Sequence, residues 1–193
     1  VKTSFTLSKN RYSATGCSLG TSGIIGYGHI GKDDSDDYQY AYDVDFFSNT
    51  FVRKTVEGGG IQTISSAINT SSYAIFAGGA KTPQGGTAGG NSYWQTFDKN
   101  YTRREIHVTN FNRYDLKRAL VNNTGVFGGG QSYMSVLPEV KAINNNLTIS
   151  SLSNLTYSNS LYCSTYIKNY AIYMDRRTDN TIVDVYDKNL VKT

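Results

Sequence analysis

The sequence predicts an all-β protein built from repeated four-stranded antiparallel units, and two observations lead to this prediction. The first is composition: 19 glycines and 16 tyrosines in 193 residues, with only 2 prolines, are typical of short strands and turns. The second is an internal repeat. The segment VFGGG at 126–130 matches IFAGG at 75–79 and IIGYG at 24–28, with a spacing of 51 residues in both steps. A fourth copy, IYMDR at 172–176, follows 46 residues later and has lost the glycines.

Composition and charge narrow the class of protein further. The length of 193 residues is enough for one domain with a sizeable core or for two small ones, and the 38% of hydrophobic residues is that of an ordinary globular protein. The net charge of +4 is scattered without a basic run, so we expect no nucleic-acid binding. The longest apolar runs have four to six residues, too short to span a bilayer. Because the chain begins with Val1 rather than Met, we interpret it as a processed product or a segment of a longer chain.

Two further markers accompany the repeat. NRY occurs at 10–12 and again at 112–114, a separation of 102 residues, or two repeat lengths. The other marker trails the four copies by 17, 21, 16 and 13 residues: YDVDFF from Tyr42, FDKNYT from Phe97, INNNLT from Ile143 and YDKNLV from Tyr186. Internal periodicity near 50 residues is the signature of propellers and related arrays.

The third unit shows what each repeat contains. It reads as four short β-rich pieces bounded by Asn, Gly or Ser: RYDLKRALV, GVFGGGQ, EVKAINN and LTISSL. A single four-stranded antiparallel sheet cannot bury both of its faces, so such units stack radially as the blades of a β-propeller. We expect about four blades in this chain, at 8–56, 57–108, 109–155 and 156–193, with residues 1–7 as an outer strand of a neighbouring or closing blade.

The glycines are interpreted as part of this architecture. They allow close approach of backbones and a bulge before the loop that follows the second strand. A phosphate-binding loop would need a following helix and a Lys-Ser/Thr pair, and neither is present.

These residues resemble kelch repeats. In that family an apolar pair runs into a di-glycine, and a spaced Tyr-Asp pair opens the third strand. The segments YAIFAGG…FDKNY and GVFGGG…INNNL are similar to this pattern, especially to the degenerate kelch-like repeats of bacterial and phage proteins. The resemblance covers nearly the whole chain. It departs from the family where the tryptophan expected after the Tyr-Asp pair is replaced by Tyr101, Leu147 and Leu190.

The number of blades leaves three alternatives open. In the first, the stretch VKTSFTL at 1–7 completes the fourth blade and closes the ring. In the second, the chain is a segment of a larger propeller. In the third, another subunit completes the ring. The second alternative is favoured because four-bladed rings are uncommon. Closure would bring Cys17 and Cys163 into neighbouring blades; otherwise we interpret both cysteines as buried small hydrophobic residues.

Recognition is expected in the loops between the second and third strands, because they differ most between units and lie at the surface. These loops are HIGKDDSDDYQY, GAKTPQGGTAGGNSYW, QSYMSVLPE and DRRTDNT. Aromatic side chains beside small polar ones suit contact with sugars or protein surfaces. The binding candidates on this loop face are therefore Asn91, Tyr93, Trp94, Gln131 and Tyr133.

The acidic run of the first loop, Asp33, Asp34, Asp36 and Asp37, is a further binding candidate. It lacks the alternating ligand spacing and the distal glutamate of a calcium loop, so we expect a solvated acidic loop and no metal. His29 and His107 have no paired ligand nearby, and no triad or carboxylate pair is specified. The sequence therefore predicts no catalytic residues and no cofactor.

Three classes of function remain. The first is a non-catalytic binding or structural module of a phage virion or tail-like particle, with a role in host-surface attachment. The second is a glycan-binding adhesion module of a bacterial surface. The third, least favoured, is an enzyme similar to kelch-fold oxidases or sialic-acid isomerising proteins. The expected partners are other structural proteins of a particle or a host-surface glycan, at the virion or the cell surface, and an oligomer is among the arrangements left open.

Overall fold

The computed structural model describes residues 6–34, 38–60, 63, 65–81, 89–133, 135–158, 163–176 and 181–193, and every regular element in these residues is a β-strand. Three antiparallel sheets have four strands and a fourth sheet has three. This confirms the all-β prediction and the four-stranded antiparallel unit. In the described residues there is no helix with the length and apolar character needed to cross a membrane.

The four sheets follow one another along the chain. Sheet 1 contains β1 (Thr15–Leu19), β2 (Ser22–Gly26), β5 (Asp43–Phe47) and β6 (Arg53–Glu57). Sheet 2 contains β7 (Ser66–Asn69), β8 (Tyr73–Ala77), β11 (Tyr93–Asp98) and β12 (Arg103–His107). Sheet 3 contains β13 (Lys117–Val121), β14 (Thr124–Gly128), β17 (Val140–Ile143) and β18 (Ile149–Leu152). Sheet 4 contains β19 (Cys163–Ile167), β20 (Tyr170–Arg176) and β21 (Thr181–Tyr186).

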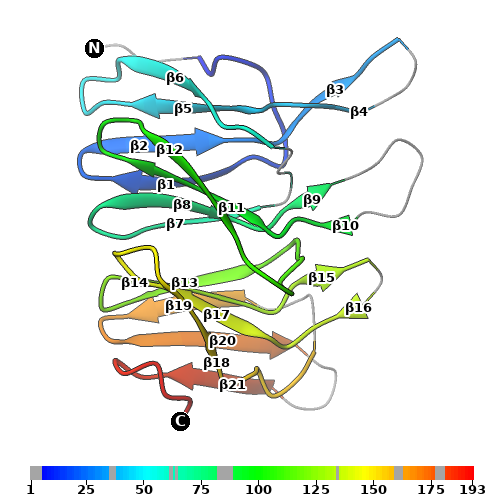
Figure 1. The fold of residues 1–193 in the computed structure, drawn as a ribbon, viewed down its shortest axis with the longest axis vertical. Helices are drawn as coiled ribbons and strands as arrows, with labels where there is room; N and C mark the ends of the chain where they lie inside the picture. The colour runs from blue at the N-terminus through cyan, green and yellow to red at the C-terminus, as the bar shows by residue number, and fades with distance from the viewer. Residues whose placement is uncertain are drawn as a thin grey trace.

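The sheets stack in chain order, with sheet 1 at one end and sheet 4 at the other (Figure 1). Their first strands lie beside one another, β1 against β7, β7 against β13 and β13 against β19. In every sheet the strand order runs from this shared edge outward in sequence order. The arrangement is propeller-like, because each sheet resembles a blade whose first strand lies nearest a common axis.

The 51-residue repeat corresponds to the second strand of each sheet. Ile25, Phe76, Phe127 and Tyr173 occupy the same position on β2, β8, β14 and β20. Each pairs with the first and the third strand of its sheet, which is the central location expected for this marker.

The trailing marker has a different role from the one expected. In sheets 2 to 4 it ends the third strand and forms the turn that follows, which leads to a fourth strand in sheets 2 and 3. Asp98 Oδ1 accepts hydrogen bonds from the backbone N–H of Asn100 and Thr102, at 2.8 and 2.9 Å. Asn144 and Asp187 do the same in sheets 3 and 4, and in sheet 1 the turn begins at Ser48. The alignment of Tyr42 with this marker was therefore wrong by five residues, because Tyr42-Asp43 imitates Phe97-Asp98 in sequence alone.

Three hydrophobic clusters hold consecutive sheets together. Sheets 1 and 2 share the first cluster, which includes Ile24 and Phe76, and sheets 2 and 3 share the second, which includes Trp94 and Phe127. Sheets 3 and 4 share the third, which contains Val126 and Tyr173. Burial of these side chains between sheets is the main stabilising contribution expected for such a stack.

The glycines of the repeat have the predicted architectural role. Gly130 has a φ of +85°, and a Cβ at this position would lie 2.6 Å from the backbone oxygen of Tyr114. Gly28 in the first unit has a φ of +100°, and a Cβ there would lie 2.5 Å from the backbone oxygen of Tyr12. Only glycine fits such a close approach of two backbones at positive φ.

The loops between second and third strands carry small antiparallel hairpins. These are β3–β4 (His29–Lys32 and Tyr38–Tyr40), β9–β10 (Ala80–Lys81 and Gly89–Gly90) and β15–β16 (Gln131–Ser132 and Ser135–Val136). All three project from the same edge of the stack, which we call the hairpin edge (Figure 1). The location of these three variable loops at one edge agrees with the prediction, and most of the fourth loop, 175–181, lies outside the described residues.

The two terminal sheets are relevant to the expected closure of the ring and to the expected burial of the two cysteines. Val1–Phe5, the main part of the expected closing strand, lie outside the described residues, and sheets 1 and 4 lie at opposite ends of the stack (Figure 1). Cys17 and Cys163 are both free thiols. Cys17 is half-buried and Cys163 is exposed, so the expectation of two buried cysteines was wrong for Cys163, whose strand lies at the end of the stack.

Candidate functional site

Aromatic side chains gather at the hairpin edge. The exposed ring of Tyr12 stacks on His29 with centroids 4.9 Å apart, and His29 tilts against Tyr40 at 5.1 Å. Burial lowers the pKa of His29 below its ordinary value, so the ring is neutral at physiological pH. At the neighbouring unit Tyr93 packs on His107 at 4.9 Å while remaining half exposed.

Trp94 is not part of this surface. It lies on β11 next to Tyr93 but on the opposite face of the strand, and none of its surface is exposed. Its ring contacts Phe127 at 4.8 Å and Phe111 at 5.8 Å between centroids. The prediction of Trp94 as a binding residue was wrong, because successive side chains of a strand point to opposite faces and this one faces the core.

The remaining candidates from the second and third loops do lie at the hairpin edge. Asn91 follows β10 and its side-chain oxygen accepts a hydrogen bond from the backbone N–H of Tyr93 at 2.8 Å. Gln131 on β15 accepts a hydrogen bond from the Tyr114 hydroxyl at 2.8 Å. Tyr133 is 57% exposed at the tip of its hairpin, the largest exposure of any described tyrosine.

A hollow of about 260 Å³ lies beside Tyr93. Its lining combines one aromatic ring with amide, hydroxyl and carboxylate groups: Gly60, Gly90, Asn91, Ser92, Tyr93, Glu105 and Asn112. The Asn112 side-chain oxygen is buried and has no hydrogen-bond partner in the described part of the chain. Sequence reasoning missed Ser92, Glu105 and Asn112, although Asn112 belongs to the repeated NRY marker. This lining offers both a stacking surface and hydrogen bonds to a neutral polar ligand.

The acidic run of the first loop is only partly described. Asp33 and Asp34 are exposed, and Asp33 accepts a hydrogen bond from the side-chain amide of Gln39. Asp36 and Asp37 lie outside the described residues. The described side chains contain no group of three or more His, Cys, Asp or Glu that could hold a metal ion.

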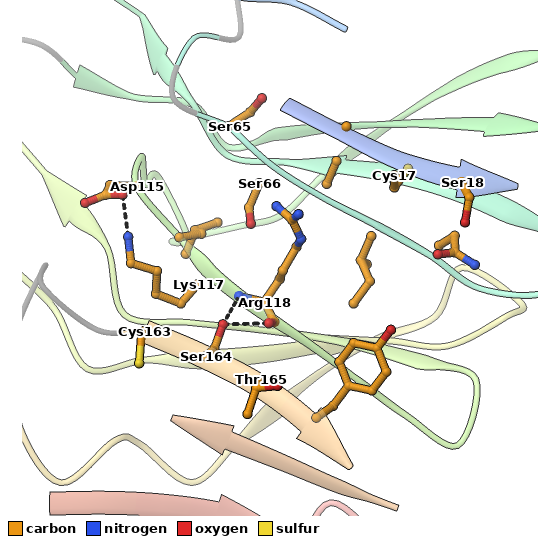
Figure 2. A pocket seen from close by; sticks show the side chains of 16 residues that line it. Cys17, Ser18, Ser65, Ser66, Asp115, Lys117, Arg118, Cys163, Ser164 and Thr165 are labelled. Atoms are coloured by element: carbon orange, nitrogen blue, oxygen red, sulfur yellow. Dashed lines mark hydrogen bonds and ion pairs between the residues drawn. The ribbon is translucent and has the colours of Figure 1, made fainter. Parts of the chain in front are cut away.

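A larger cavity of about 680 Å³ lies where the first strands of the four sheets converge (Figure 2). Four segments line it: 16–18 on β1, 65–69 at β7, 115–118 at β13 and 163–166 on β19. Most of its side chains are polar, and the two cysteines lie on it at well-separated places (Figure 2). Sequence reasoning did not foresee this cavity, because its walls are about 50 residues apart along the chain.

Charge in the cavity is carried by β13 and by the residues just before it. Lys117 Nζ lies 2.6 Å from Asp115 Oδ1, so these two charges compensate each other. Ser164 Oγ accepts from the backbone N–H of Arg118 at 2.9 Å and donates to its carbonyl at 2.6 Å, fixing this residue against β19 (Figure 2). In the described part of the chain the Arg118 guanidinium has no hydrogen-bond or ion-pair partner, so it can receive an anionic group.

The Cys17 thiol on the same cavity is not prepared for nucleophilic chemistry. Burial raises its pKa to about 12, and the Arg118 charge offsets this only in part. A thiol with so high a pKa is almost entirely protonated near neutral pH and reacts slowly.

The repeated NRY marker has a structural role. The Arg11 side chain is fully buried and lies 3.3 Å from Asp45 Oδ2, with a second contact at 3.3 Å to Asp43. Ser8 adds hydrogen bonds to Asp45 Oδ2 from its backbone N–H and its hydroxyl, both at 2.8 Å. Arg113 in the other copy pairs with Glu139 at 2.8 Å.

Sheet 4 repeats the Ser8–Asp45 arrangement at Thr156 and Asp184. Thr156 donates from its backbone N–H and its hydroxyl to the Asp184 carboxylate at 2.8 and 2.6 Å, and Lys192 lies 2.8 Å from it. Burial opposes ionisation of Asp184, but the hydrogen bonds from Lys192 and Thr156 outweigh it and hold the pKa below 3.8. The pKa of Asp43 is lowered in the same way, with burial outweighed by the Ser8 hydrogen bond and the Arg11 charge.

Comparison with known proteins defines the fold and no more than the fold. No protein-family model matches the chain, and no curated protein matches it. Among solved structures 138 chains match, so the fold recurs among solved proteins. One of them, described as "Structure of YjhT", is similar with a TM-score of 0.70 at 10% sequence identity. The match covers 95% of this chain and 70% of that chain.

Proposed function

We propose that this chain is a β-propeller module of about four kelch-like blades whose activity is binding rather than catalysis. The ligand is a carbohydrate on a cell surface, held at the hairpin edge. The observation that carries the proposal is the hollow beside Tyr93, where one half-exposed ring lies among the polar groups of Asn91, Ser92, Glu105 and Asn112. An aromatic face with amide and carboxylate groups around it matches the apolar face and hydroxyl rim of a sugar ring.

The setting proposed is a phage virion or tail-like particle, in which the module contacts the host surface and other structural proteins of the particle. The kelch-like pattern of the degenerate bacterial and phage type supports this setting. The alternative is an adhesion module on a bacterial surface, which would use the same edge and the same ligand chemistry. The phage module and the adhesion module differ in where the protein is found, at a virion or at a bacterial cell surface. Both would use the same carbohydrate site at the hairpin edge.

Binding of labelled, purified protein to bacterial cells tests the proposal, with stripped wall glycans as competitors. We expect saturable binding that free glycan abolishes. Tyr93→Ala should weaken this binding by about tenfold or more, the loss expected when a central aromatic contact is removed. Tyr166→Ala is the matched control, because Tyr166 is 51% exposed where Tyr93 is 46% exposed, and it lies near the end of β19, away from the hairpins.

Two results would contradict the proposal. One is binding that survives Tyr93→Ala unchanged while Tyr166→Ala removes it. The other is an absence of binding to any cell or glycan, which would move the interpretation to a purely structural role within a particle.

A further inference from the structure

The contacts between consecutive sheets follow a single rule of register. The tail face of a sheet is defined as the face that packs against the following sheet, and the head face is the one that packs against the preceding sheet. Val44, Trp94 and Val140 occupy the same position on the tail faces of sheets 1, 2 and 3. They are 0%, 0% and 1% exposed, so the following sheet covers this position completely each time.

Sheet 4 has the same position without a cover. Val183 on β21 pairs with Met174 on β20 as Val140 on β17 pairs with Gly128 on β14. Val183 is nevertheless 48% exposed, and Met174 is 41% exposed. Ile167 at the end of β19 is 60% exposed. The tail face of sheet 4 is thus an apolar surface of the type that three other sheets bury, and such surfaces mark interaction sites.

The head face of sheet 1 is the other uncovered member of the series. Ile25 corresponds to Phe76, Phe127 and Tyr173, each of which is fully buried against the preceding sheet, whereas Ile25 is half-buried.

The glycines of the head faces repeat this difference. A Cβ on Gly125 in sheet 3 would lie 2.8 Å from Ile68 of sheet 2. The corresponding Gly23 in sheet 1 would meet nothing within 4 Å. The space that the preceding sheet fills at sheet 3 is therefore empty at sheet 1.

The polar part of this head face is already arranged for packing. Ser8 binds Asp45 through its backbone N–H and hydroxyl, as Thr156 binds Asp184 in sheet 4. In sheet 4 this arrangement coexists with close packing against sheet 3, through Tyr173 in the shared cluster. The same hydrogen bonds at sheet 1 therefore satisfy the buried carboxylate without obstructing a sheet that would dock there.

We propose that these two faces bind each other between copies, with the tail face of sheet 4 docking on the head face of sheet 1 of a second copy. The inference rests on the packing rule and is independent of the carbohydrate function. A head-to-tail contact makes a closed ring or an open filament. Two copies of the four described sheets together have eight sheets, a number within the four to eight blades of known propellers.

Light scattering coupled to size exclusion tests the proposal on the full 193-residue chain. We expect twice the mass of one chain at concentrations from about 1 to about 100 µM. Val183→Asp changes the tail face and Ile25→Asp changes the head face. Each should raise the dimer Kd by about 100-fold or more, because an unpaired carboxylate would be buried in the interface. Mixing the two variants should recover dimers, since one interface of each mixed dimer then joins two unaltered faces.

Controls separate loss of docking from loss of folding. Val52→Asp places the same charge at a residue that is 66% exposed in the turn before β6, outside both faces, and should leave the dimer unchanged. Circular dichroism should show all three variants folded, because the altered side chains are not fully buried in one chain. Wild-type protein that is a monomer throughout the range overturns the proposal, and so does a mass that grows beyond two copies. A dimer that Val183→Asp breaks but Ile25→Asp does not would be a tail-to-tail contact and would also overturn it.

Discussion

Tyr93 and Trp94 are adjacent on β11 with opposite surroundings, and alanine at each position should separate binding from stability. Trp94 is fully buried and contacts Phe127 and Phe111 across the boundary between sheets 2 and 3. Truncating a buried tryptophan costs about 3–5 kcal/mol through lost burial and the cavity left behind. For a chain of this size each kcal/mol lowers Tm by about 2–4 °C, so Trp94→Ala should lower Tm by about 6–20 °C.

Tyr93→Ala should change the free energy of unfolding by less than about 1 kcal/mol, because the side chain is half exposed, and should weaken cell binding. Trp94→Phe is an informative intermediate. The Trp94 indole N–H is buried and finds no acceptor in the described part of the chain, so removing it relieves a desolvation cost and offsets part of the lost packing.

Thermal unfolding followed by near-ultraviolet circular dichroism measures the stability of each variant, and the cell-binding assay measures recognition. If Trp94→Ala keeps the wild-type Tm but loses binding, Trp94 contacts the ligand and is not a core residue. If Tyr93→Ala lowers Tm as much as Trp94→Ala does, Tyr93 is part of the core and not of a binding surface.

Three further predictions concern the turns, the carboxylates and the thiols. Asp98→Ala removes two hydrogen bonds to backbone N–H groups and should lower the free energy of unfolding by about 1–2 kcal/mol in urea titrations, whereas Asp98→Asn should cost less than half as much. The folded-state pKa of Asp184 lies below 3.8, so the ionised Asp184 carboxylate stabilises the fold above that pH, and this contribution is lost as pH falls through the folded pKa. Unfolding midpoints measured from pH 6 to pH 2 should therefore fall less steeply with decreasing pH in Asp184→Asn than in the wild type. An unchanged slope would contradict this prediction. A thiol reagent at pH 8 should label the exposed Cys163 quickly. It should label the half-buried Cys17, whose pKa is about 12, only when the protein unfolds. Fast labelling that persists in Cys163→Ser would show that Cys17 is accessible and would contradict this prediction.

The sequence allowed the second strands to be predicted because their signal is both local and repeated. Ile25, Phe76 and Phe127 recur at one spacing, and the glycines after them are required by positive φ and by close backbone contacts. Each copy independently indicates the same strand, so an error in one copy is corrected by the others. This redundancy is why the unit length and the all-β class followed from the sequence.

The error at Trp94 has a physical origin. A strand alternates inward and outward side chains, so the pattern leaves two alternatives until one residue is anchored. The long preceding loop has no apolar anchor, and Tyr93 and Trp94 are both aromatic, so nothing local distinguished the outward ring from the buried one. The wrong alignment of Tyr42 with the trailing marker has a related cause. An aromatic-Asp pair stands at the start of the third strand in sheet 1, as Tyr42-Asp43, and at the end of the third strand in sheet 2, as Phe97-Asp98.

The central cavity could not be predicted because it depends on contacts between units. Arg118 and Ser164 meet across 46 residues of chain, and each segment that lines the cavity is unremarkable by itself. Only the side-by-side placement of the first strands brings these segments together, and no spacing in the sequence records it.

The three separate hydrophobic clusters affect how this protein can change in evolution. Each cluster joins two consecutive sheets, so the total stability is close to a sum of terms between nearest neighbours. A tandem duplication of one unit would create a new boundary of the type already present and leave the others intact. Deletion of an internal unit would likewise rejoin compatible faces, so the number of sheets can change in steps of about 50 residues while the core composition stays the same.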